Sequence, residues 1–325
     1  TLTLSSGGAI TMNSTIAANQ LIHANLALGA TATITNSSTT NDLILSGAIS
    51  GATALTKAGA GIVRLDGNNN FTGITTVSAG TLQLGNANAL GAVGATNYTV
   101  VSNNATLDLN GQTIAEAFGV AAASGDGFGG ANATLINSSA TAASITGTIN
   151  FDGAGAFKVD GPGIISLTRY GRTSGTSGDV TLTKEGEGTL ILGGTADNSA
   201  AGLVVNNGTV ELAKSAGGVR VVGSVGVTLN GDAVGRITAA GGDQIFSSGS
   251  ITMTGTSVFE LNGFNEQVNN LNSAVATTVI RNGHATNAST LSVGGGNGSS
   301  TFAGVIENGG AAAMGIAQNG TGTLT

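Results

Sequence analysis

The chain repeats one short phrase at long, similar intervals, and this repetition constrains its fold more than any other feature. The phrase reads LTKAGAG at 55–61, LTKEGEG at 182–188 and IAQNGTG at 316–322. Lys57, Lys184 and Gln318 hold the same place in the three copies, and the second interval is nearly equal to the first. A sequence that repeats itself in this way usually stacks copies of one structural unit.

Further phrases recur between these markers in the same order. AGTLQLG at 79–85 is matched by NGTVELA at 207–213, and LDLNGQ at 107–112 is matched by FELNGF at 259–264. The order divides the chain into a partial repeat 1–54, repeats 55–181 and 182–315, and the start of a further repeat at 316–325. We therefore expect one continuous repeat segment over 1–325, whose two ends continue in a longer protein.

Composition favours a folded chain. Glycine supplies 55 of the 325 residues, but 40% of the residues are hydrophobic and only 8% are charged, whereas disordered chains are poor in hydrophobic residues and rich in charge. No cysteine is present, which removes disulfides and thiolate metal sites together. Stability must therefore come from hydrogen bonds and packing.

Charge and the lengths of the apolar runs argue against two classes of partner. The net charge is −7, and the acidic and basic residues are scattered singly, so no basic stripe is available for a phosphate backbone. We expect no nucleic-acid partner. No apolar run approaches the ~18 residues that a membrane helix needs. We therefore expect no membrane insertion by this segment, and any export signal or anchor would lie outside this sequence.

Within the repeated phrases, polar and apolar residues alternate. This period of two, built from Thr, Val, Ile and Leu, predicts strands with one buried face. The residues expected to face one narrow core are Leu82, Leu84, Leu107, Leu109, Leu190, Leu192, Val210, Leu212, Phe259 and Leu261. Those expected on the outside are Thr81, Gln83, Asp108, Glu211 and Glu260.

Glycines mark the length of one coil. The interval from Gly61 to Gly80 is nearly the same as the interval from Gly188 to Gly208. At roughly 20 to 25 residues per coil, the chain would form on the order of 14 coils of an all-β parallel solenoid, without significant helix. A sandwich or barrel of hairpins is the alternative, because Asn-Gly pairs are also typical of hairpins. The glycines expected at corners, where the backbone needs a positive φ or a close approach, are Gly59, Gly61, Gly80, Gly186, Gly188, Gly208, Gly320 and Gly322.

One run of the sequence carries a family resemblance. Residues 55–91, LTKAGAGIVRLDGNNNFTGITTVSAGTLQLGNANALG, resemble the passenger-associated repeat of bacterial autotransporters, and LTKEGEGTLIL with NGTVELA carries the same resemblance in the second copy. The middle of the second copy departs from the pattern, because it lacks the equivalent of Phe71, Thr72 and Gly73. The resemblance implies a right-handed parallel β-helix that is exported to the bacterial cell surface or secreted.

Few residues could carry catalysis or bind a metal. His23 and His284 lie in different repeats, so they cannot share a metal ion or a proton relay. Glu185 and Glu187 are two residues apart, so on a strand their side chains would point to the same side. Such a pair of carboxylates could in principle serve a solenoid enzyme that cleaves glycans. Two neighbouring acids on an exposed strand more often serve solubility. We expect no catalytic residue, no metal and no cofactor.

One segment departs from the repeat pattern. Arg169, Tyr170 and Arg172 fall in a stretch rich in Ser and Gly, between GPG at 161–163 and the second LTKEGEG. Loops on a solenoid commonly carry function, and Arg with Tyr can stack on sugars or pair with carboxylates. The three residues are therefore a candidate binding loop, with a plain solvated insertion as the alternative.

The sequence predicts a structural or adhesive segment of an exported bacterial surface protein, a rigid stalk or fibre that is not an enzyme. Its expected partners are a host or cell-surface glycan or protein, or identical segments that associate end to end. Two other classes fit the same fold: a glycan hydrolase or lyase on a β-helix, and a phage tailspike or fibre. A cluster of carboxylates with a bound glycan or calcium would indicate the enzyme, and a trimer would indicate the phage fibre.

Overall fold

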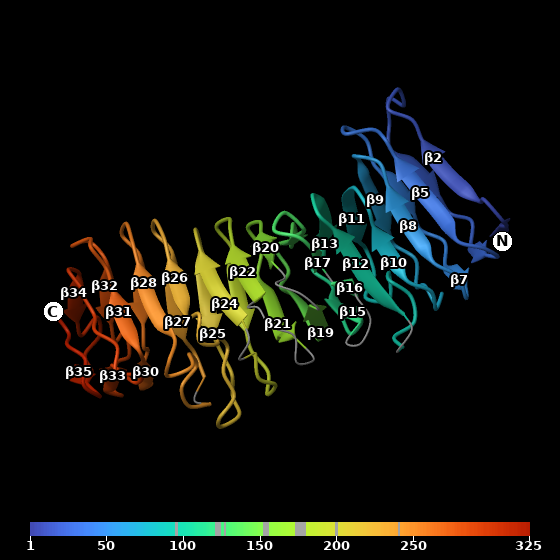
Figure 1. Ribbon diagram of the computed structural model, residues 1–325. Coiled ribbons are helices and arrows are strands. Elements are labelled where there is room, and N and C mark those ends of the chain that lie inside the picture. The colour runs from blue at the N-terminus through green and yellow to red at the C-terminus, as the bar shows by residue number, and fades with distance from the viewer. Residues whose placement is uncertain are drawn as a thin grey trace. The chain divides into compact units, whose positions relative to one another are not determined.

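The computed structural model describes residues 1–94, 97–120, 125–126, 128–151, 156–172, 180–198, 201–239 and 241–325 (Figure 1). The chain forms two compact units, the first over Thr1–Ile165 and the second over Ser166–Arg172 and Ser177–Thr325. Every element of the described residues is a strand. Among these residues, no helix has the length and hydropathy that a membrane crossing requires. That the two units form one continuous repeat segment stays a prediction.

The first unit contains short strands that recur in the same order. They are β1 (Leu2–Leu4), β2 (Ala9–Met12), β3 (Gln20–Ile22), β4 (Leu26–Leu28), β5 (Ala32–Asn36), β6 (Leu43–Leu45), β7 (Ile49–Gly51), β8 (Leu55–Ala58), β9 (Ile62–Leu65), β10 (Thr75–Val77), β11 (Gly80–Leu84), β12 (Tyr98–Ser102), β13 (Ala105–Asp108), β14 (Thr113–Ile114), β15 (Ala117–Val120), β16 (Gly125–Asp126), β17 (Phe128–Gly129), β18 (Thr134–Ile136), β19 (Ala143–Phe151) and β20 (Ala156–Asp160).

The second unit continues the pattern from β21, whose residues belong to this unit from Ser166 onward. Its strands are β21 (Ile165–Arg172), β22 (Val180–Lys184), β23 (Thr189–Leu192), β24 (Ala201–Val205), β25 (Thr209–Leu212), β26 (Val227–Leu229), β27 (Val234–Ile237), β28 (Ser250–Met253), β29 (Val258–Glu260), β30 (Glu266–Val268), β31 (Asn270–Asn272), β32 (Val279–Arg281), β33 (Ser289–Val293), β34 (Val305–Glu307) and β35 (Met314–Gln318).

Strands of successive turns pair in parallel, so each unit is a β-solenoid (Figure 1). Leu43 pairs with Val63, and Val63 pairs with Leu82, so these two turns are nearly equal in length. The turn from Leu107 to Leu135 is longer, because it also holds β14 to β17. The predicted all-β solenoid is confirmed, with about 12 turns in place of about 14. Such longer turns account for the difference.

The core follows the period-two alternation. All ten residues that the sequence places inside are at most 1% exposed, so this prediction is confirmed. In the first unit, aromatic rings also stack inside the core: the ring centroids of Phe118 and Phe128 are 5.7 Å apart, and those of Phe128 and Phe157 are 4.7 Å apart. Aliphatic and aromatic side chains thus fill the narrow interior.

Two residues expected outside are buried, and here the sequence prediction is wrong. Asp108 is 2% exposed and Glu260 is 6% exposed, whereas Thr81, Gln83 and Glu211 are half-buried. Alternation predicts which face of a strand a residue occupies, but side chains of neighbouring turns can still bury a residue on the outer face. The carboxylate of Asp108 accepts hydrogen bonds from the amide nitrogen of Gln83, 2.8 Å away, and from the Ser138 hydroxyl, 2.6 Å away. Glu260 is covered by arginines.

The corner glycines fall into two groups. Gly59, Gly80, Gly186, Gly208 and Gly320 adopt φ between 61° and 77°, in the left-handed region that side chains with a Cβ disfavour. Gly61, Gly188 and Gly322 have no positive φ. At Gly61, a Cβ atom would overlap the carbonyl oxygen of Ser38 on the preceding turn, so close backbone approach requires the glycine there.

Candidate functional site

The lysine of the repeated phrase is buried in the first unit. Lys57 lies on β8 and is only 2% exposed. Its Nζ donates hydrogen bonds to the carbonyl oxygens of Gly59, at 2.6 Å, of Ala79, at 2.7 Å, and of Ala58, at 3.2 Å. Ala79 belongs to the next turn, so one ammonium group joins two successive corners. Burial lowers the pKa of Lys57 to about 8.

Lys184 takes the same place in the second unit and is also buried. Its Nζ donates to the carbonyl oxygens of Glu185 and of Gly186, the latter at 2.6 Å. A buried ammonium that satisfies corner carbonyls explains why the phrase repeats a lysine before its glycines. Sequence reasoning did not anticipate a charged core residue, and both lysines were missed as structural anchors.

Glu185 and Glu187 bind asparagines of the next turn. Asn206 donates from its amide nitrogen to Glu185 Oε1 at 2.8 Å, and Asn207 donates to Glu187 Oε1 at 3.3 Å. Asn230, one turn further, donates to Asn206 Oδ1 at 2.8 Å. The two carboxylates therefore anchor a column of amide hydrogen bonds between turns. This is a structural arrangement, and it leaves each acid with an amide partner.

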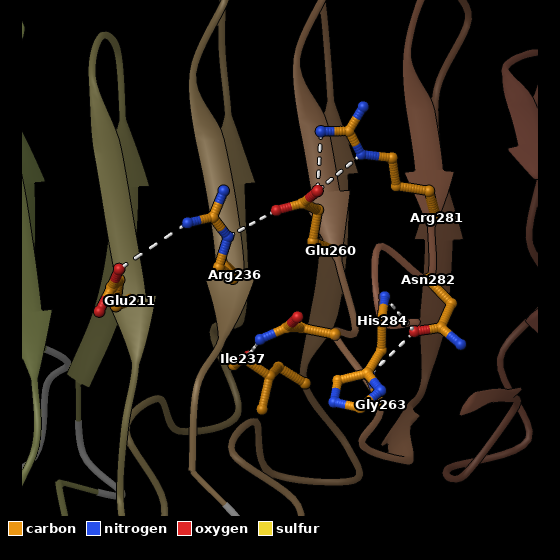
Figure 2. Close-up of polar contacts among 9 residues, drawn as sticks. Glu211, Arg236, Ile237, Glu260, Gly263, Arg281, Asn282 and His284 are labelled. Carbon is orange, nitrogen blue, oxygen red and sulfur yellow. Dashed lines mark hydrogen bonds and ion pairs between the residues drawn. The ribbon is translucent and has the colours of Figure 1, made fainter. Parts of the chain in front are cut away.

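A column of alternating charges crosses the outer face of the second unit (Figure 2). Glu260 accepts from Arg236 Nε at 2.5 Å on one side, and from Nε and Nη2 of Arg281, each at 2.7 Å, on the other. Glu211 lies 3.9 Å from Arg236 Nη1. Burial alone would raise the pKa of Glu260, but its hydrogen bonds to the two arginines and their charges outweigh burial and hold the pKa below its ordinary value.

The column follows the strand register. Glu211 on β25 pairs with Arg236 on β27, which pairs with Glu260 on β29, then with Arg281 on β32. Arg281 pairs in turn with Glu307 on β34. Each pair joins neighbouring turns, because parallel stacking places equivalent residues of successive strands side by side. Neither arginine could be predicted as part of this column, because the pairing register of the strands cannot be read from a sequence with unequal turn lengths.

His284 forms part of a corner beside this column (Figure 2). The backbone N–H of His284 donates to Asn282 Oδ1 at 3.2 Å, and Nδ1 of its ring accepts from the backbone N–H of Asn287 at 2.9 Å. Ser38 makes the same two contacts in the first unit, with Asn36 and Asn41. The histidine thus replaces a serine in a recurring turn.

His23 lies in the first unit, where its Nδ1 is 2.8 Å from the hydroxyl oxygen of Ser46. It is exposed at the surface. Among the described residues, no group of three or more His, Asp or Glu side chains could hold a metal ion. Four cavities of about 240 to 480 Å³ lie among these residues, and Asp243 is the only acidic residue in their linings.

The candidate binding loop is a strand. Arg169, Tyr170 and Arg172 belong to β21 (Ile165–Arg172), and Tyr170 is fully buried. The Tyr170 hydroxyl donates to the carbonyl oxygen of Val221 at 3.2 Å, so its ring cannot stack on a ligand. Arg169 is half-buried, and the structure describes Arg172 by its backbone alone. One face of this strand is apolar and includes Leu167, and this face packs in the core.

A buried polar chain connects several turns of the second unit. The Nζ of Lys214 donates to the carbonyl oxygens of Thr168, at 2.7 Å, and of Gly193, at 2.5 Å. Its backbone N–H donates to Gln244 Oε1 at 2.8 Å, and the backbone N–H of Gln244 donates to Glu266 Oε2 at 2.8 Å. Lys214, Gln244 and Glu266 are all buried. These polar side chains replace solvent as partners for backbone groups inside the corner.

Two buried carboxyl groups have pKa values well above the ordinary value of glutamate. Burial raises the pKa of Glu266 to about 8, although backbone N–H groups of Gln244 and Ile245 oppose the shift. Burial also raises the pKa of Glu116 to about 8, against the opposing hydrogen bond from the Thr99 hydroxyl, 2.7 Å away. Neutral carboxyl groups avoid the cost of a buried charge.

The chain is expected to be more stable at pH 5 than at pH 8. Between the ordinary pKa of 4.5 and the folded value of about 8, an unfolded Glu116 or Glu266 releases its proton and a folded one keeps it. The free energy of unfolding therefore falls as pH rises through this window, by up to about 1 kcal/mol per pH unit for each carboxyl. Thermal unfolding at both pH values checks this. The variant Glu116→Gln/Glu266→Gln should show a smaller difference in Tm, and an unchanged difference would contradict the assignment.

Two comparisons with known proteins agree with this geometry. Residues 55–84 and 182–212 match the family model of the passenger-associated-transport-repeat. Over 183 residues, or 54% of this chain, the sequence is 34% identical to the adhesin BmaC autotransporter of Brucella suis biovar 1 (strain 1330). The matching part spans 5% of that protein. No solved structure matches the chain. The resemblance to an autotransporter passenger is confirmed.

Proposed function

We propose that this autotransporter passenger segment is a structural and adhesive part of an exported bacterial surface protein and does no catalysis of its own. The similarity to an adhesin autotransporter and the two passenger repeats support this function. They also support a location at the cell surface or outside the cell. The partners proposed are a glycan or a protein on a host or cell surface. End-to-end association with identical segments is a second proposal.

One structural observation carries the non-catalytic role: the candidate acids already have partners in neighbouring turns. Glu185 and Glu187 accept from Asn206 and Asn207, and Glu260 is bound on both sides by arginine. A catalytic pair of carboxylates needs one acid to protonate the leaving group and a second to act as base or nucleophile. Acids that are held by neighbouring turns serve the stiffness of the solenoid.

A glycan hydrolase or lyase, and a phage tailspike or fibre, are the competing functions on a similar scaffold. The carboxylate partners described above favour the structural segment over the enzyme. The passenger repeats at 55–84 and 182–212 favour an autotransporter over a phage fibre. We therefore retain the structural and adhesive role alone.

Adherence of coated beads tests the proposal. Beads that carry the native chain should bind to cultured host cells or to matrix proteins more than beads coated with a carrier protein of similar net charge. The matched carrier controls for the charge of −7. The same chain unfolded in urea before coupling should lose the excess binding, because adhesion depends on the folded surface. Equal binding of native-chain beads and carrier beads would overturn the adhesive role.

A further inference from the structure

Each turn of a solenoid must pair with the correct neighbouring turn. On one sheet of the second unit, a column of valines is so uniform that it does not distinguish the correct neighbour from a wrong one. Four outward valines stack in register on β27, β29, β32 and β34: Val234, Val258, Val279 and Val305. The inward positions beside them are apolar as well, with Phe259 paired to Ile280 and Ile280 paired to Ile306. If one turn looped out, valine would again meet valine.

The adjoining outward column differs from turn to turn. Its five residues, called the charge column below, are Glu211, Arg236, Glu260, Arg281 and Glu307. In the native register every neighbour in the column has the opposite charge, and Glu260 lies within 2.7 Å of both arginines (Figure 2). A register that omits the turn of Glu260 would set Arg236 against Arg281. Like charges directly opposite each other in a sheet are destabilising.

We propose that the charge column sets the turn register of the second unit, because it makes the native pairing of turns favourable and the pairing across a skipped turn repulsive. Neighbouring turns are so similar that hydrophobic burial alone specifies the register weakly. The half-buried arginines and the buried carboxylate strengthen the discrimination, since charges removed from solvent interact more strongly. The proposal adds a role in folding to the structural function and does not depend on adhesion.

Cysteine pairs can report the register, because the chain has no cysteine of its own. In the native register, Val234 and Val258 lie on adjacent strands, roughly 4.8 Å apart, whereas Val234 and Val279 lie two strands apart, roughly 10 Å. A disulfide needs Cα atoms closer than about 7 Å. Oxidation during refolding should therefore cross-link Val234→Cys/Val258→Cys, and it should leave Val234→Cys/Val279→Cys mostly reduced.

Reversal of one charge in the column should change the proportions of the two cross-links. In Arg236→Glu, the native neighbours Glu211 and Glu260 both become repulsive, and the slipped pairing with Arg281 becomes attractive. We expect the ratio of the 234–279 cross-link to the 234–258 cross-link to rise at least threefold over the native background. The ratio should also exceed the value measured for the same chain oxidised in urea, which represents the unfolded chain.

Inversion of the whole column is the matched control. The variant Glu211→Arg/Arg236→Glu/Glu260→Arg/Arg281→Glu/Glu307→Arg restores the alternation, and it should return the ratio to the native value. A ratio in Arg236→Glu that equals the native value or the urea value would overturn the proposal, since the reversal would then change nothing or only unfold the chain. Failure of the inverted column to restore the native ratio would overturn it as well.

Discussion

Replacement of Lys57 by methionine is expected to lower the free energy of unfolding by about 3 kcal/mol. Methionine has a similar length and fills the same space, so the main loss is the ammonium donor. Three carbonyl oxygens, of Ala58, Gly59 and Ala79, would lose their partner inside the corner. A buried acceptor left unsatisfied costs about 1 kcal/mol or more. Urea unfolding followed by far-ultraviolet circular dichroism measures the change.

Lys158→Met provides the control in the same unit. Lys158 lies on β20 and is half-buried, and substitutions at such positions usually change stability by less than about 0.5 kcal/mol. The two variants remove the same charge from the same chain, so a difference between them isolates the corner. Equal losses in both variants would mean that the lysine corner adds nothing beyond its charge.

Truncation of a core leucine should have an effect of similar size. Leu190 on β23 is fully buried, and Leu190→Ala is expected to cost about 2 to 5 kcal/mol through lost burial and the cavity that remains. Ile191, the next residue, is half-buried on the outer face, so Ile191→Ala should cost much less although it removes as many carbon atoms. Urea unfolding of both variants measures the two changes in the free energy of unfolding. A larger loss of stability for Ile191→Ala than for Leu190→Ala would contradict the orientation of the strand.

Alternation in the sequence was enough to predict the solenoid and its core, and the same alternation extends to the repeated lysines. Lys57 is two residues after Leu55, and Lys184 is two after Leu182, so strict alternation places both lysines on the inner face. Their charge argued for the outside, since lysine is almost never fully buried without partners. The partners are backbone carbonyls of tight corners, which a sequence does not display.

The charge column could not be predicted, because its spacing is irregular. The step from Glu260 to Arg281 is shorter than the steps from Glu211 to Arg236 and from Arg236 to Glu260. Only the parallel register of the strands shows that these four residues are neighbours. Alternation also fails where a strand shifts phase. Leu167 and Tyr170 are both buried, although strict alternation would put them on opposite faces.

Incubation of the native chain with a panel of host and bacterial polysaccharides tests most directly whether this segment acts without catalysis. Newly formed reducing ends and unsaturated sugar products would be measured for the native chain and for Glu185→Gln/Glu187→Gln, with thermal unfolding to verify that both are folded. No product above background is expected from either protein, because both acids are bound to asparagines of the next turn. Turnover by the native chain that disappears in the folded variant would contradict the structural account.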